Sequence, residues 1–174
     1  MRALGPGSVS SILKTALDVV FWALIVAGAG VFLLTVGGVV FGGQLQFRAP
    51  GLTLRATQDE WGFIALVLAF VLVTLAGLLL IVEKLRRVFA TLTIGEPFQP
   101  DNIRRLRTIG FTLAGLELLA YLGRIGAYHM ADVRLSRPDY WPNFTAWFAV
   151  LVVFVLAEVF REGARLRQEA DLTI

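Results

Sequence analysis

The sequence predicts an all-α membrane protein: a four-transmembrane-helix bundle with the last helix extended into the cytoplasm. Of the 174 residues, 57% are hydrophobic and 17% are charged, whereas soluble domains contain about 45–50% apolar and about 25% charged residues. The apolar residues occur in long runs, and a helix needs roughly 20 of them to cross the hydrocarbon core of a bilayer. Because short charged segments separate the runs, we expect one integral membrane domain over residues 1–174.

The first predicted span covers about residues 16–41, and most of it belongs to an uncharged run that begins at Val19. Arg2 and Lys14 would also suit the positive leader of a cleaved signal peptide. The apolar run, however, continues well beyond the roughly 7–15 residues of a signal-peptide core, so we expect an uncleaved anchor. Asp18 is expected to cap the positive end of the helix dipole at the start of this helix.

The second predicted span, about residues 61–82, is the clearest, because no charge interrupts it between Glu60 and Glu83. Residues 44–60 connect it to the first span. They hold Pro50-Gly51 between two short apolar stretches, a pattern that allows either a bare loop or a small β-hairpin.

The third predicted span, about residues 108–130, contains Glu117 and Arg124. Its strongly apolar residues favour insertion by about −2 to −5 kcal/mol in total, and a central acid opposes it by about +3 kcal/mol. The balance lies near zero, so we expect this helix to insert beside neighbours that shelter its polar face. The fourth predicted span covers about residues 140–160, and Pro142 suits its first turn.

The distribution of positive charge predicts the orientation in the membrane. With four spans, most of the 16 lysine and arginine residues lie on the side that holds both termini. Short cytoplasmic segments are enriched in these residues, so we expect a cell inner membrane protein with cytoplasmic N- and C-termini. Trp61, Tyr140 and Trp141 then fall at the outer interface, where aromatic residues are enriched. The cytoplasmic arginines are expected to contact the lipid bilayer.

Residues 83–107 are expected to form a cytoplasmic elbow between the second and third spans. Gly95 and Pro97 suit the end of one helix, and Asp101 is a good N-cap for the next. The candidate binding residues of this elbow are Gly95, Glu96, Pro97, Phe98 and Asn102.

Residues 158–174 carry opposite charges three or four positions apart, a spacing that forms ion pairs along a helix. We therefore expect the fourth helix to continue into the cytoplasm and to end in a semi-apolar tail suited to docking. A narrow apolar stripe on this helix would consist of Val159, Gly163, Leu166 and Ala170. The candidate residues of this C-terminal motif are Glu158, Arg161, Glu162, Arg165, Glu169, Asp171, Leu172, Thr173 and Ile174.

These two stretches carry a resemblance to a known family. The Gly-Glu-Pro-Phe elbow that starts at Gly95 and the closing Glu-x-Asp-Leu-Thr-Ile from Glu169 to Ile174 resemble the bacterial membrane family called domain of unknown function 2975. The resemblance extends over nearly the whole chain and implies four helices, no assigned enzymatic activity and a possible cytoplasmic partner, a small helix-turn-helix regulator. The family pattern falls on Gly95, Pro97, Phe98, Asn102, Asp171, Leu172 and Thr173.

A polar face on the third helix is the other candidate site. Glu117, Tyr121, Arg124 and Tyr128 recur at helical spacing on the same face as Gly110. An ionisable residue at membrane depth is by default a candidate functional group. The face is either a structural polar seam, with Glu117 neutral or bonded to a neighbouring helix, or a proton or substrate relay. The absence of an obvious second membrane acid favours the seam.

Several classes of activity lack their signatures. The chain has no cysteine and one histidine, His129, so we expect no metal site and no cofactor. P-loop, Gly-x-Ser-x-Gly and His-Glu-x-x-His motifs are also missing from the sequence, and we expect no enzyme. The net charge of +3 is explained by membrane topology and predicts no direct binding of nucleic acid. Gly38 and Gly42 have the spacing that permits helix contact in a homo-oligomer.

The leading hypothesis is a non-enzymatic regulatory protein. Its elbow and C-terminal helix would form a cytoplasmic platform for a partner such as a small helix-turn-helix regulator. The alternative is a small transporter or a lipid- or ligand-binding bundle that uses the face around Glu117.

Overall fold

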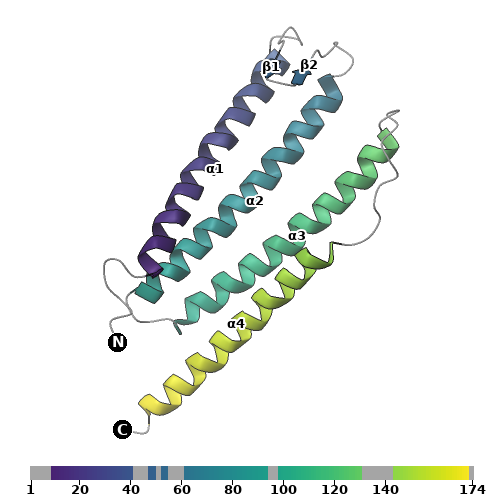
Figure 1. Ribbon diagram of the computed structural model, residues 1–174. Helices are drawn as coiled ribbons and strands as arrows, with labels where there is room; N and C mark the ends of the chain where they lie inside the picture. The colour runs from purple at the N-terminus through teal and green to yellow at the C-terminus, as the bar shows by residue number, and fades with distance from the viewer. Residues whose placement is uncertain are drawn as a thin grey trace. The chain divides into compact units, whose positions relative to one another are not determined.

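The structure, a computed structural model, describes residues 9–40, 47–49, 52–54, 61–93, 98–130 and 143–172. Its elements are α1 (Val9–Val40), β1 (Phe47–Ala49), β2 (Leu52–Leu54), α2 (Trp61–Thr93), α3 (Pro100–Met130) and α4 (Phe144–Asp171) (Figure 1). All four helices are long and apolar enough to cross a membrane. The prediction of an all-α multi-pass architecture is confirmed to that extent, and it includes the helix around Glu117.

The helices are longer than the spans that the apolar runs predict. Helix α1 has 32 residues, which corresponds to about 48 Å at about 1.5 Å per residue. It begins at Val9, so Asp18 lies well inside the helix and does not cap it. The interpretation of Asp18 as a dipole-capping residue is therefore wrong, and its carboxylate pairs with Arg86 of α2 instead.

The connection between α1 and α2 contains the β-hairpin that was one of two expectations for residues 44–60. Strands β1 and β2 are antiparallel, and Phe47 pairs with Leu54, Arg48 with Thr53, and Ala49 with Leu52. Pro50 and Gly51, which lie between the strands in the sequence, are outside the described residues. The hairpin belongs to a compact unit formed by Trp22–Leu78.

Two helix starts differ from the expected ones because short polar side chains and prolines decide where a helix begins. Helix α3 begins at Pro100, and the N–H of Asn102 donates to the carbonyl oxygen of Gln99 at 2.9 Å. Asp101 is thus in the first turn and is not the N-cap. Helix α4 begins at Phe144, and the Asn143 side chain accepts a hydrogen bond from the backbone of Ala146 at 3.3 Å, as an N-cap does.

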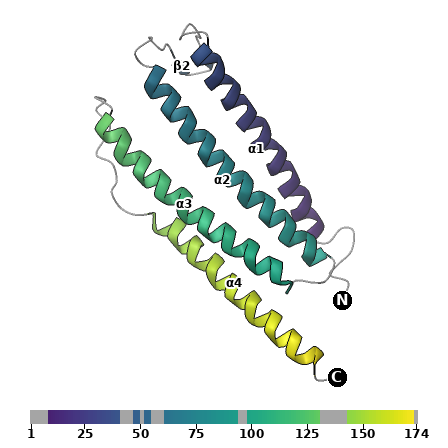
Figure 2. The same cartoon turned by 180° about the vertical axis from the view of Figure 1, so that it is seen from behind.

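The second compact unit consists of Met1–Phe21 and Leu79–Ile174, and it contains the hydrophobic core. Helices α3 and α4 pack side by side within it (Figure 2). The core cluster joins α2, α3 and α4 through Ile81, Leu106, Ile109 and Ala157. In the sequence each of these residues lies within two positions of a charged residue, so the core of this unit forms at the charged ends of the membrane spans.

Close packing between α3 and α4 depends on Gly110. A Cβ atom at this position would lie 3.0 Å from Cζ of Phe154, so a larger residue here would press on the end of that ring. The same ring makes an edge contact with Phe111, with 5.1 Å between the centroids. Elsewhere the helices expose many large apolar side chains, including Val26, Leu33 and Phe148, as expected for surfaces that face lipid.

Candidate functional site

The elbow and the C-terminal helix meet at Phe98. Its ring lies against α4 where Gly163 offers no side chain: a Cβ atom there would lie 2.5 Å from Cε1 of Phe98. The ring also packs on Phe160, with 5.7 Å between the centroids. We call this contact of Phe98, Phe160 and Gly163 the elbow junction. It joins the two stretches that carry the family resemblance.

Asn102 fixes the other side of the elbow. Its side chain is completely buried, and its Nδ2 group donates to Oγ1 of Thr91 at 2.6 Å. Its Oδ1 atom accepts from Nη1 of Arg105 at 2.8 Å. Both ends of the buried amide are thus hydrogen-bonded, as burial of a polar group requires. Asn102 therefore ties the end of α2 to the start of α3 and has a structural role in shaping the elbow.

A groove of about 620 Å³ lies beside the elbow junction, and we call it the elbow groove. One wall comes from the elbow and is largely apolar; the other comes from α4 and carries arginines. The lining residues are Phe98, Gln99, Pro100, Ile103, Arg161, Ala164, Arg165, Arg167 and Gln168.

The expected ion pairs along α4 are confirmed. Arg161 pairs with Glu158. Arg165 lies 2.8 Å from Glu162 and 3.3 Å from Glu169. These pairs are exposed, and each contributes about 0.2–0.5 kcal/mol to helix stability. Their main effect is to neutralise two of the three arginines that line the elbow groove.

On the polar face of α3, the structure places two of the predicted residues in contact. Nη2 of Arg124 lies 3.4 Å from Oε1 of Glu117, whose side chain is 14% exposed. Tyr121 is partly buried on the same helix. Because the acid already has a basic partner two turns along its own helix, the geometry favours a structural polar seam over a relay.

Several predicted residues lie outside the part of the chain that the structure describes. Leu172 ends α4, and its N–H donates to the carbonyl oxygen of Gln168 at 3.3 Å. Gly42, Gly95, Glu96, Pro97, Tyr140, Trp141, Pro142, Thr173 and Ile174 lie outside the described residues, as do the side chains of Trp61, Tyr128, His129 and Asp171.

Sequence reasoning missed the partners of three residues. Thr91 was not singled out, although it receives the buried amide of Asn102. Gly163 was assigned only to an apolar stripe, and Asp18 only to the end of a helix. One sequence signal could have indicated Thr91. It is a polar residue in the last turn of a helix, followed after a short connection by an asparagine in the first turn of the next helix.

The described residues contain no group of three or more potential metal ligands. They place no nucleophile beside a base in the elbow groove, which is lined by aromatic, aliphatic, amide and guanidinium groups. Such a groove is chemically suited to binding a protein segment that offers both apolar and charged side chains.

Comparison with known proteins gives one match. No curated protein and no solved structure matches the chain. The family model described as "Protein of unknown function (DUF2975)" matches residues 53–174, which include the elbow junction and the elbow groove and leave α1 outside the match. Because that match covers well over half of the sequence, the chain belongs to the DUF2975 family.

Proposed function

We propose that this protein is a non-enzymatic, regulatory membrane protein whose elbow groove is a cytoplasmic platform for a partner protein. The observation that carries the proposal is the contact of Phe98 with Gly163. It holds the elbow against α4, so two segments that are more than 60 residues apart in the sequence form one continuous surface.

The charges support the cytoplasmic side. Arg104, Arg105 and Arg107 lie in the first turns of α3, and the paired arginines of α4 line the elbow groove. Cytoplasmic segments are enriched in such residues. Helix α4 has 28 residues, about 42 Å at about 1.5 Å per residue, and about 30 Å suffices to cross the hydrocarbon core. This length leaves about 12 Å of helix beyond the hydrocarbon core, which supports an extension of its last turns into the cytoplasm.

The lining of the elbow groove supports a protein partner. Its elbow wall is apolar, whereas Arg161 and Arg165 on the other wall are already paired with carboxylates. Nucleic acid, which requires unpaired positive charge, is a poor ligand for such a surface. An amphipathic helix matches it, and a small helix-turn-helix regulator is the partner that the family resemblance implies.

The test places a photo-crosslinking amino acid at Ala164 in the full-length protein and irradiates native membranes. We expect a covalent adduct with a cytoplasmic protein, because Ala164 lines the elbow groove. The same amino acid at Phe148, which is exposed elsewhere on α4, should give no such adduct.

A pair of glycine variants makes the test specific. Gly163→Ala should remove the adduct, since the added Cβ displaces Phe98. Gly115→Ala should preserve it, since nothing lies within 4 Å of a Cβ there. An adduct that forms equally from residues 164 and 148, or that survives Gly163→Ala unchanged, would contradict the platform.

A further inference from the structure

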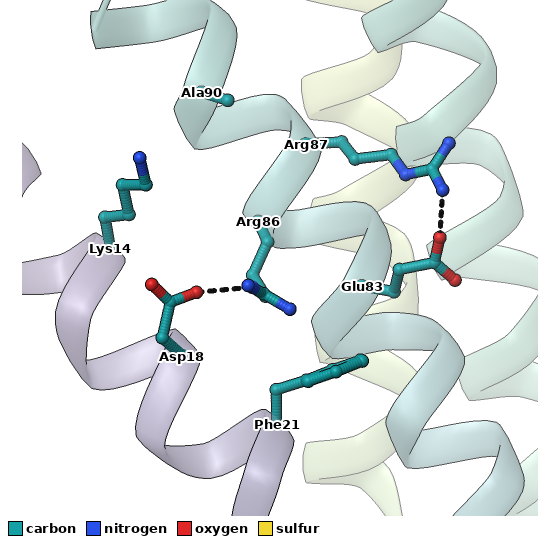
Figure 3. Close-up of a pocket in the computed structure, with 7 residues that line it drawn as sticks. All are labelled: Lys14, Asp18, Phe21, Glu83, Arg86, Arg87 and Ala90. Atoms are coloured by element: carbon teal, nitrogen blue, oxygen red, sulfur yellow. Dashed lines mark hydrogen bonds and ion pairs between the residues drawn. The ribbon is translucent and has the colours of Figure 1, made fainter.

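A second pocket, of about 380 Å³, lies between α1 and α2. We call it the α1–α2 pocket; all the residues that line it belong to the compact unit of Met1–Phe21 and Leu79–Ile174. Figure 3 shows Asp18 of α1 directed at Arg86 of α2, while Lys14 extends from the neighbouring turn of α1 along the pocket and Arg87 is directed toward Glu83. The lining residues are Lys14, Asp18, Phe21, Glu83, Arg86, Arg87 and Ala90.

The charges of this pocket leave a surplus of one positive charge. Nε of Arg86 lies 2.5 Å from Oδ1 of Asp18, and Arg87 pairs with Glu83. Lys14 is exposed, and no carboxylate of the described residues forms an ion pair with it. A single anion would therefore balance the pocket.

Arg86 is held in place for such an anion. The Asp18 carboxylate contacts Nε of Arg86, and Cζ of Arg86 lies 4.4 Å from the centroid of the Phe21 ring. Because Asp18 contacts only Nε, the N–H groups of the two Nη atoms at the forked end of the guanidinium group can donate to another oxygen. This fork matches the oxygens of a phosphate, and a lysine supplies a point charge beside it.

The pocket lies where the charged ends of the two helices become apolar. On α1 the uncharged run begins at Val19, and on α2 it ends at Val82. Val19 and Val20 follow Asp18 directly and are 63% and 45% exposed. A phosphate in the pocket would thus be adjacent to an apolar helix surface on which an acyl chain packs.

We propose that the α1–α2 pocket binds the phosphate of an anionic phospholipid. Arg86 and Lys14 contact the phosphate oxygens, and an acyl chain lies along Val19 and Val20. Basic pockets between membrane helices bind lipid headgroups in this way. A free phosphate ion would use the same cations but would gain nothing from the exposed valines. The site is independent of the elbow groove and of the proposed partner.

The test measures lipid binding to the purified full-length protein in a neutral detergent by native mass spectrometry. Phosphatidylglycerol and phosphatidylcholine with identical acyl chains are titrated separately, and inorganic phosphate is added as a competitor. We expect the protein to retain phosphatidylglycerol in preference to phosphatidylcholine. Inorganic phosphate at the concentration of the lipid should displace little of it.

Variants with matched loss of charge locate the site. Lys14→Gln should weaken phosphatidylglycerol binding about fivefold, the effect of removing one favourable charge near a headgroup, and Lys14→Arg should preserve it. Arg104→Gln removes one charge from an exposed residue of α3 in the same unit and should leave binding unchanged.

Three results would overturn the proposal. Equal weakening by Lys14→Gln and Arg104→Gln would indicate general attraction of anionic lipid to a basic protein. Equal retention of the two lipids would remove the role of the headgroup charge. Full displacement by inorganic phosphate would make the pocket a site for a soluble anion.

Discussion

At the scale of single residues, the most unusual group is the acid within the membrane-length helix α3. Glu117 is largely buried and lies 3.4 Å from Arg124, a residue two turns away on the same helix. The Arg124 side chain is 42% exposed, so loss of its partner costs little. Loss of Arg124 leaves the more buried Glu117 without compensation, which is the costlier change. The two residues therefore act as a unit, which variants can reveal.

We predict that Arg124→Gln lowers the thermal unfolding midpoint in detergent more than Glu117→Gln does. The first change leaves a carboxylate unpaired, and the second leaves an arginine long enough to reach the interface. The double variant should unfold at a higher temperature than Arg124→Gln alone. If Glu117→Gln were the most damaging change, or abolished a transport activity without affecting stability, the relay interpretation would replace the structural one.

Residue patterns predicted interactions within a helix better than interactions between helices. The ion pairs of α4 follow from helical periodicity and were predicted. The sequence placed Glu117 and Arg124 on one face of α3, but it predicted a neutral Glu117 or a bond to a neighbouring helix and not a pair along α3. The partners Asp18 and Arg86, or Thr91 and Asn102, lie on different helices. Lipid tails are as apolar as leucine, so an apolar run carries little information about which helix lies beside it.

At the scale of elements, helix ends were predicted less well than helix existence. The length of an apolar run predicts the part of a helix that lies in the hydrocarbon core. The helix itself continues beyond the core until a residue that disfavours helix ends it. Helix α2 accordingly extends past Glu83 as far as Thr93. The start of α4 was misplaced because Asn143, an N-cap, was not recognised among the polar residues that precede Phe144.

The elbow junction gives a prediction about two elements at once. Gly163→Ala should destabilise the protein by about 1–3 kcal/mol, as overpacking does, because the Cβ atom meets the ring of Phe98. Phe98→Ala in the same chain should recover part of that loss, giving a coupling free energy of about 0.5–3 kcal/mol. The measurement is the unfolding of both single variants and the double variant in detergent.

Gly115→Ala is the matched control, because a Cβ atom at this position meets no neighbour within 4 Å. It should leave stability unchanged or raise it by about 0.5–1 kcal/mol through the helix propensity of alanine. Strictly additive effects of Gly163→Ala and Phe98→Ala would show that the two residues do not press on each other.

At the scale of the whole molecule, composition and apolar runs were enough to predict four membrane-length helices, and the structure confirms them. The orientation rests on the bias of lysine and arginine. We predict that alkaline phosphatase fused after Ile174 is inactive and that the same enzyme inserted after Gly51, between the sequences of β1 and β2, is active, because the reporter folds only outside the cytoplasm.

Green fluorescent protein at the same two positions is the complementary reporter and should give the reverse result. An active phosphatase after Ile174 would place α4 on the opposite side and would contradict the cytoplasmic platform. The α1–α2 pocket would retain its chemistry in that case, but it would face the other leaflet.

The contact of Phe98 with Gly163 also orders events during synthesis. The elbow leaves the ribosome long before α4 does, and a nascent chain that ends before residue 160 has nothing on which this ring can rest. The elbow junction therefore forms only after the last helix has been translated.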